Sequence, residues 1–155
     1  MFIPYARQSI SDQDIAAVSE VLRSDFLTQG PAIPNFETAL ATYCGAKHAV
    51  AVNSATSALH IACLALEVGP GDIVWTNPIS FVASANCALY CGAKVDFVDI
   101  DPDTFNISIA ALTAKLERAK KSGSLPRVVI PVHLAGQSSD MAAIHELAQD
   151  YGFKI

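Results

Sequence analysis

The segment 53–57, Asn-Ser-Ala-Thr-Ser, gathers hydroxyl and amide side chains where an apolar run ends and a helical pattern begins. At a helix start several backbone N–H groups lack a partner within the helix, and the helix dipole adds positive potential. Residues 54–57, Ser-Ala-Thr-Ser, could therefore form a cradle for a phosphate group. Taken alone, the segment favours an ordinary Ser/Thr N-cap over a binding site. Neither a Walker A pattern nor GxGxxG is present, so ordinary nucleotide binding has no support.

Two ring-bearing side chains follow other predicted strands. Phe81 comes shortly after a strand expected at 72–76, where its ring could stack on a flat cofactor, although a lone phenylalanine more often packs in the core. His133 directly follows a strand expected at 127–132 and could either line a pocket or satisfy a backbone group. In open α/β sheets ligands bind beyond the carboxyl ends of the strands, which is the edge where both residues are expected.

A lysine that forms a Schiff base with a cofactor must lie at the same edge as that cofactor. The lysines of this chain are Lys47, Lys94, Lys115, Lys120, Lys121 and Lys154. They are expected at the amino ends of strands, on a helix and its end, or inside a terminal strand. The sequence therefore offers no catalytic lysine among residues 1–155.

Alternating helical and strand patterns must position these residues. Helices are expected at 11–23, 35–44, 55–67, 80–91, 107–121 and 140–151, and strands at 48–53, 72–76, 94–98 and 127–132. The final residues, 153–155, resemble the start of a further buried strand, so we expect the chain to be truncated. Repeated strand–helix–strand units predict an α/β fold with a mainly parallel sheet and helices on both faces.

The composition argues against several classes of function. Of the 155 residues 52% are hydrophobic, and the net charge of −5, without any basic run, argues against nucleic-acid binding. The start of the chain has no signal-peptide pattern, and its apolar stretches are too short to span a membrane. The four cysteines lack CxxC spacing and the histidines lack ligand spacing. We therefore expect a soluble cytoplasmic protein without a metal site.

Several motifs together resemble one protein family. They are FLTQGP at 26–31, FE at 36–37, NSATSALH at 53–60, PISFVASAN at 78–86, VDID at 98–101 and PVHLAG at 131–136. Their order and spacing are similar to the DegT/StrS family of sugar aminotransferases along the whole chain. The versions at 53–57 and 78–81 look most like the branch that aminates a UDP-linked sugar on the pseudaminic acid pathway.

The resemblance implies the large domain of the type I aminotransferase fold, a three-layer α/β structure with a mainly parallel sheet. Residues 1–34 would form an N-terminal helix and substrate loop, and 35–155 the first part of the cofactor-binding domain. An acidic residue facing the pyridine nitrogen, a phosphate-binding serine and the Schiff-base lysine would all follow Ile155, as would the small C-terminal domain.

The resemblance also implies roles for individual residues. Ala55 and Thr56 would bind the phosphate of pyridoxal 5'-phosphate (PLP), and Phe81 would stack on its pyridine ring. Contacts to the nucleotide-sugar, across the interface of a homodimer, would come from Tyr5, Asp25, Phe26, Leu27 and Thr28. Most family members carry glycine at position 54 or 55, a departure that changes the surroundings of the phosphate.

The implied activity is transamination in two half-reactions. Glutamate would supply the amino group, and the C4 ketone of a UDP-linked 4-keto-6-deoxy amino sugar would receive it. Two alternatives remain open. A truncated, non-catalytic chain would keep half of a cofactor site, and a relative that uses PLP to dehydrate sugars would carry histidine in place of the lysine, beyond residue 155.

Overall fold

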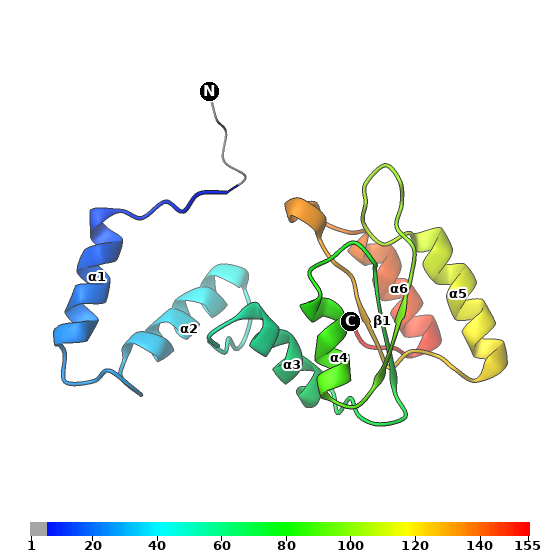
Figure 1. The fold of residues 1–155 in the computed structure, drawn as a ribbon, viewed down its shortest axis with the longest axis horizontal. Coiled ribbons are helices and arrows are strands. Elements are labelled where there is room, and N and C mark those ends of the chain that lie inside the picture. Colours follow the sequence, from blue (N-terminus) through cyan, green and yellow to red (C-terminus); the bar gives the residue numbers. More distant parts are fainter. Residues whose placement is uncertain (1–5) are drawn as a thin grey trace. The chain divides into compact units, whose positions relative to one another are not determined.

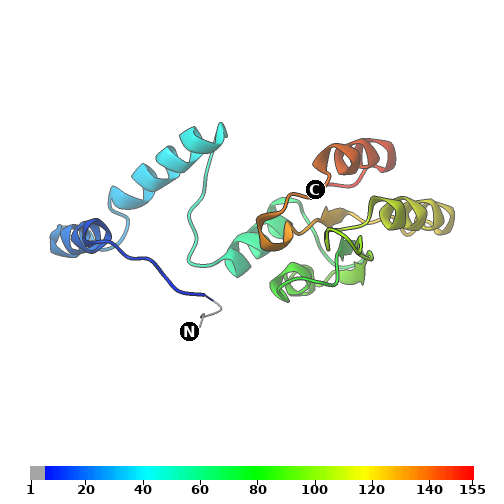
Figure 2. The ribbon, with the colours of Figure 1, turned by 90° about the horizontal axis from the view of Figure 1, so that it is seen from above.

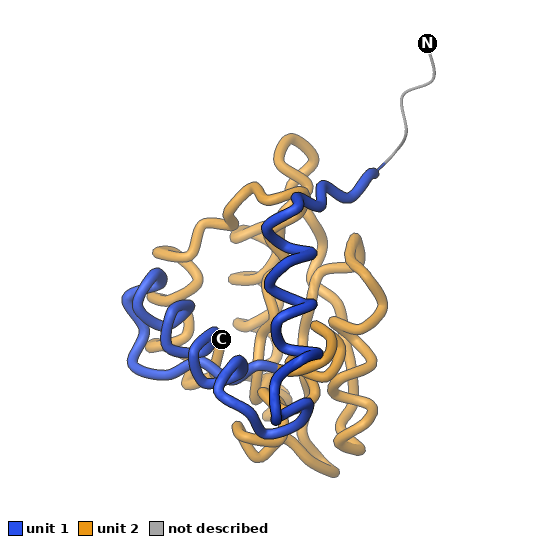
Figure 3. The backbone as a smooth tube through the Cα atoms, turned by 90° about the vertical axis from the view of Figure 1, so that its left-hand side faces the viewer, with its two compact units in different colours: residues 1–51 blue, residues 52–155 orange. Residues whose placement is uncertain are grey.

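The structure, a computed structural model, describes residues 6–155, which divide into two compact units. The first unit ends at Ala51 and the second spans Val52–Ile155 (Figure 3). Within the described residues the first unit is helical, whereas the second contains a parallel sheet and the helices that cover it.

Local sequence explains the two helices of the first unit. α1 (Asp12–Arg23) begins with a capping box in which Asp14 N–H donates to Ser11 Oγ (3.3 Å) and Ser11 N–H donates to Asp14 Oδ2 (2.8 Å). α2 (Ala32–Cys44) begins before the predicted start at 35. It can do so because Pro34 falls in the first turn, where a missing N–H costs no helical hydrogen bond.

The predicted strand at 48–53 is wrong, because these residues, all of which the structure describes, form no strand. A strand needs a neighbour that pairs with its backbone groups. Here Ala51 N–H instead donates to the side-chain Oε1 of Glu37 (2.8 Å), and Val50 is 74% exposed. The apolar pattern of this segment was therefore not sufficient to produce a strand.

The sheet of the second unit confirms the predicted parallel arrangement. Its strands are β1 (Ile73–Thr76), β2 (Lys94–Phe97) and β3 (Val128–Ile130), in the order β2-β1-β3. Beside β3, Lys154 N–H donates to Arg127 O (2.9 Å) and Val129 N–H donates to Lys154 O (2.8 Å). The residues expected to start a further strand thus pair with β3 in parallel, as an isolated bridge.

Helices cover both faces of this sheet (Figures 1 and 2), which confirms the expected α/β class. The helices are α3 (Ala55–Ala65), α4 (Ala83–Tyr90), α5 (Ile109–Ser122) and α6 (Met141–Tyr151), with a short 3-10 turn at Leu134–Gly136. No helix within residues 6–155 has the length and apolar character needed to cross a membrane.

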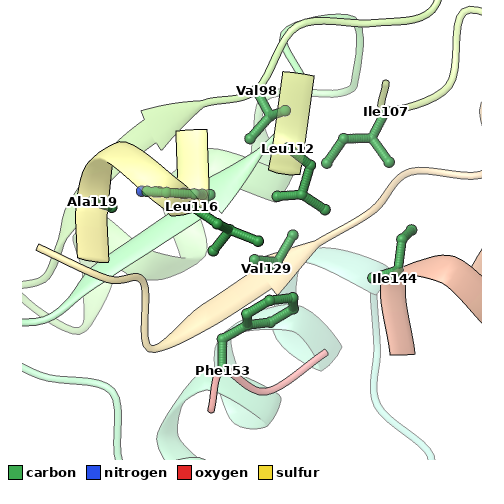
Figure 4. Close-up of a cluster of buried hydrophobic side chains, with 9 residues drawn as sticks. Val98, Ile107, Leu112, Leu116, Ala119, Val129, Ile144 and Phe153 are labelled. Carbon is green, nitrogen blue, oxygen red and sulfur yellow. The ribbon is translucent and has the colours of Figure 1, made fainter. Parts of the chain in front are cut away.

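Alternate side chains of β1 point into two separate cores. Trp75 packs with residues of α5 and α6. Figure 4 labels three of them, Leu112, Leu116 and Ile144. Val74 packs on the other face with the cysteine and alanine side chains of α3 and α4. The two cores fix the strands between the helix layers, so the ends of β1 and β3 have defined positions.

One ion pair joins β2 to α5 across the first of these cores. Lys115 Nζ lies 2.7 Å from Asp96 Oδ2, also donates to Phe97 O, and lies 4.7 Å from the centroid of the Trp75 ring. Burial tends to raise the pKa of Asp96. The hydrogen bonds from Lys115 and from Phe97 N–H, together with the lysine charge, outweigh burial and hold that pKa below its usual value of 3.8.

We expect Asp96→Asn to lower the free energy of unfolding at neutral pH, and the difference from wild type to shrink as the solution is acidified. A lowered folded-state pKa stabilises the fold above the pKa of the unfolded chain, and this contribution is lost as pH falls through the folded-state pKa. Urea unfolding at about pH 7, 4 and 3 measures the difference.

The matched control is Asp103→Asn, which removes an exposed carboxylate outside this pair and should change stability little at any of these pH values. A deficit in Asp96→Asn that persists undiminished in acid would contradict the ion pair as its source.

Candidate functional site

The start of α3 has the geometry of an anion site. Ser57 N–H donates to Ser54 Oγ (3.1 Å), and Ser57 Oγ donates to Asn53 Oδ1 (2.8 Å). The backbone N–H groups of Ala55 and Thr56, by contrast, make no hydrogen bond to any residue within 6–155. Neither aspartate nor glutamate lies in the first turn. Ser54 is therefore an N-cap, as the sequence favoured, yet two donors at the positive end of the helix stay available for a phosphate.

Phe81 lies between β1 and α4, beyond the carboxyl end of β1. Its side chain is 75% exposed, so the interpretation of Phe81 as a core residue does not hold in this chain. Beside it is a mostly apolar cavity of about 180 Å³, lined also by Ser80, Val82 and Phe97. An exposed aromatic ring next to such a cavity is suited to contact with a flat, apolar ligand surface.

Sequence reasoning missed Asn77, which joins the segments that follow β1 and β3. Its side chain is 1% exposed; Val132 N–H donates to Oδ1 (3.0 Å), and Nδ2 donates to Ile79 O (3.2 Å). The neighbouring Thr76 Oγ1 donates to Ile130 O (2.9 Å). The one available signal was a carboxamide placed directly after an apolar strand.

His133 takes one of the two roles that the sequence left open. Ser139 N–H donates to His133 Nδ1 (3.1 Å), so the ring does satisfy a backbone group. The side chain is nevertheless exposed, beyond the carboxyl end of β3. Because β3 pairs directly with β1, His133 and Phe81 follow neighbouring strands at one edge of the sheet.

The predicted sugar-contacting residues belong to the first unit. They lie exposed in the loop between α1 and α2 and are Asp25, Phe26, Leu27 and Thr28. At the start of this loop Ser24 Oγ lies within hydrogen-bond distance of the carbonyl oxygens of Val21 and Phe26. Tyr5 lies outside the described residues. The structure describes the first unit separately from Ala55, Thr56 and Phe81, so the role of this loop stays a prediction.

The lysines all lie within the described residues. Lys115 is the one that reaches the end of β2, but its Nζ is bound to Asp96 on the face of the sheet that α5 covers. Phe81 precedes α4, which covers the other face. Lys94 begins β2 at its amino end, and Lys154 pairs beside the start of β3. Among the lysines of the second unit, Lys94, Lys115 and Lys154 therefore lie away from Phe81.

The second unit combines a parallel sheet, free N–H groups at the start of α3 and an exposed ring beyond the carboxyl end of β1, which are features expected of a protein that binds a phosphorylated, flat cofactor. The chain belongs to the DegT/DnrJ/EryC1/StrS aminotransferase family, which matches residues 8–155. The α/β fold and the family expected from the motifs are both confirmed.

Individual relatives support this membership. The "Spore coat polysaccharide biosynthesis protein SpsC" of Bacillus subtilis (strain 168) is 44% identical over 154 residues, which are 99% of this chain and 38% of that protein. The "UDP-4-amino-4-deoxy-L-arabinose--oxoglutarate aminotransferase" of Shewanella sediminis (strain HAW-EB3) is 39% identical over 154 residues, again 99% of this chain and 38% of the relative.

Among solved structures, NtdA from Bacillus subtilis with bound cofactor PMP superposes with a TM-score of 0.79 at 34% identity. The match covers 90% of this chain and 31% of that one. The chain thus spans about two-fifths of the length of the curated relatives, 38% in both.

We expect Asn77→Ala to lower the free energy of unfolding by about 1–3 kcal/mol, because Val132 N–H, which is part-buried, would lose its partner. Urea denaturation provides the measurement. The matched control, Asn35→Ala, changes an exposed asparagine of α2 and should cost less than about 0.5 kcal/mol. Equal costs for the two variants would show that the side-chain bonds of Asn77 do not hold the two segments together.

Proposed function

We propose that this chain is part of a PLP-dependent transaminase that transfers an amino group from glutamate to the C4 ketone of a UDP-linked 4-keto-6-deoxy amino sugar. Membership of an aminotransferase family supports the reaction class. The printed name of the Shewanella relative contains both a UDP-linked amino sugar and oxoglutarate, the keto acid formed when glutamate gives up its amino group. That name supports a UDP-sugar and the glutamate–oxoglutarate couple as substrates.

The observation that carries the proposal is the start of α3. A phosphate ester needs several donors and little competing negative charge. The free N–H groups of Ala55 and Thr56, with the Thr56 hydroxyl beside them, supply the donors, and the first turn carries no acidic side chain. The residues present therefore fit the phosphate group of PLP.

The chain's own residues would bind and orient rather than transform the substrate. Ala55 and Thr56 would hold the phosphate, and Phe81 would cover one face of the pyridine ring and keep water from it. PLP, when bound, supplies the electron sink for the reaction. Contacts to the nucleotide-sugar would come from Tyr5, Asp25, Phe26, Leu27 and Thr28.

We propose further that the protein works as a homodimer in the cytoplasm, with the sugar-contacting loop serving the partner's site. The lysine that moves the proton would lie outside residues 1–155, a proposal supported by the position of Lys94, Lys115 and Lys154 away from Phe81 within the second unit. Both statements rest on the family resemblance together with the position of these residues.

The 155-residue chain by itself should form no borohydride-stable PLP adduct at a specific lysine. Reduction with borohydride after incubation with PLP, followed by peptide mass spectrometry, tests this directly. Weak labelling spread over the exposed lysines is expected, because surface amines react without selection. One stoichiometric adduct at a single lysine would contradict the proposal that the catalytic lysine lies elsewhere.

The protein expressed from its natural reading frame should convert a UDP-linked 4-keto-6-deoxy amino sugar to its amine and release one 2-oxoglutarate for each glutamate consumed. Mass spectrometry of the sugar and enzymatic assay of 2-oxoglutarate measure the two products. Loss of water from the sugar without consumption of glutamate would instead favour a PLP-dependent dehydratase.

In the same protein Thr56→Val should weaken binding of pyridoxamine phosphate (PMP) by about tenfold or more, the effect of losing one hydrogen bond to a charged group. Thr113→Val is the matched control, because that threonine lies on α5 and its hydroxyl bonds Ile109 O within the helix. An equal loss in both variants would show that Thr56 has no particular part in the site.

A further inference from the structure

The proton on His133 is directed to one ring nitrogen by its surroundings. Ser139 N–H donates to Nδ1 (3.1 Å), so in the neutral ring Nδ1 is the acceptor and Nε2 carries the hydrogen. Ser139 is itself 5% exposed, and its Oγ donates to Val132 O (3.3 Å). The exposed ring therefore presents a donor, Nε2–H, whose tautomer is set by the protein.

The loop after His133 is fixed by hydrogen bonds to a buried asparagine side chain. Asn106, 4% exposed, accepts from Leu134 N–H at Oδ1 (3.1 Å) and donates from Nδ2 to Gln137 O (3.0 Å). Between these two bonds Ala135 has φ of +51°, a conformation that residues other than glycine rarely adopt. Strained backbone that is fixed from several sides is found most often at functional sites.

The same loop is tied to the segment that carries Phe81. Asn77 Oδ1 accepts from Val132 N–H, the residue before His133, while its Nδ2 bonds Ile79 O, two residues before Phe81. The buried asparagine thus holds both ring-bearing segments at the carboxyl ends of adjacent strands.

From this geometry we propose that His133 is a cofactor-contacting residue whose Nε2–H donates to an oxygen of bound PLP or PMP other than the phosphate oxygens. The proposal rests on the proposed function. The phosphate already has its donors at the start of α3. Among the described side chains that follow β1 or β3, His133 is the one with both an exposed donor and a tautomer fixed by a hydrogen bond.

Two substitutions separate the inward role of the ring, in which Nδ1 accepts from Ser139 N–H, from its proposed outward role, in which Nε2–H donates to the cofactor. In His133→Asn the side-chain oxygen can take the place of Nδ1 and still accept from Ser139 N–H, but the outward donor is lost. In His133→Gln the longer side chain can place an amide N–H near the position of Nε2, but the inward acceptor is lost.

The test measures the affinity for PMP, which needs no Schiff-base lysine, in the protein expressed from its natural reading frame, together with its thermal stability. We expect His133→Asn to keep the wild-type melting temperature within a few degrees and to bind PMP about tenfold more weakly. His133→Gln should be less stable but recover most of the affinity. Inorganic phosphate should compete equally well in wild type and in His133→Asn.

A second readout does not depend on any variant's folding. The ¹⁵N resonance of His133 Nε2 should show a bound hydrogen in the free protein and shift when PMP is added. Through-bond correlation from the assigned backbone of His133 to its ring identifies that resonance without any variant. If His133→Asn fails to fold, this shift decides, and its absence on saturation with PMP overturns the proposal.

The remaining outcomes distinguish a failure of the role of His133 from a failure of the proposed function. PMP binding that is equal in wild type and His133→Asn overturns the role of His133 alone. Weak binding in His133→Gln with normal binding in His133→Asn assigns the ring a structural role and also overturns it. A wild-type protein that binds no PMP overturns the proposed function, and the role of His133 with it.

Discussion

The candidate site depends on one buried carboxamide. Asn77 gives up its hydration at the end of β1, a cost that is offset only if both ends of the amide are bonded. Its partners, Val132 N–H and Ile79 O, belong to the two segments that leave β1 and β3. A polar group in that position cannot relax without leaving a buried donor unpaired. The positions of the two rings that follow these strands are therefore determined by the interior of the fold.

The start of α3 shows a complementary use of hydrogen bonding. Ser54 satisfies the N–H of Ser57, which would otherwise be a third orphan donor, and leaves those of Ala55 and Thr56 unbonded. Capping and ligand binding are usually weighed against each other for such a sequence, but they concern different N–H groups of one turn. The cap fixes the direction of the first turn, and this direction sets where the free donors point.

Much of the second unit could be predicted from the sequence, because apolar periodicity and glycine ends reflect local energetics. The strand at 48–53 could not, since pairing depends on a partner that the local sequence does not contain. For the candidate site, Thr56 and Phe81 could be proposed from motif and position, whereas Asn77 was missed because its importance depends on a bond from Val132, 55 positions away. Whether His133 lined a pocket or satisfied a backbone group could not be decided from sequence, because its bond depends on where Ser139 folds back.

The net charge of −5 has a consequence for how an anionic cofactor or nucleotide-sugar would be held. A chain of this sign supplies no long-range attraction for such ligands, and charges beyond about 10 Å are screened at physiological salt. What residues 1–155 contribute to binding must then come from hydrogen bonds at contact distance, whose strength falls steeply with misalignment. For this reason the residues that set donor directions, Ser54 at α3 and Ser139 at His133, matter as much to the site as the donors themselves. A site built in this way gains specificity from geometry, which the fold supplies through the exposed Ser54 and through the buried Asn77 and Ser139.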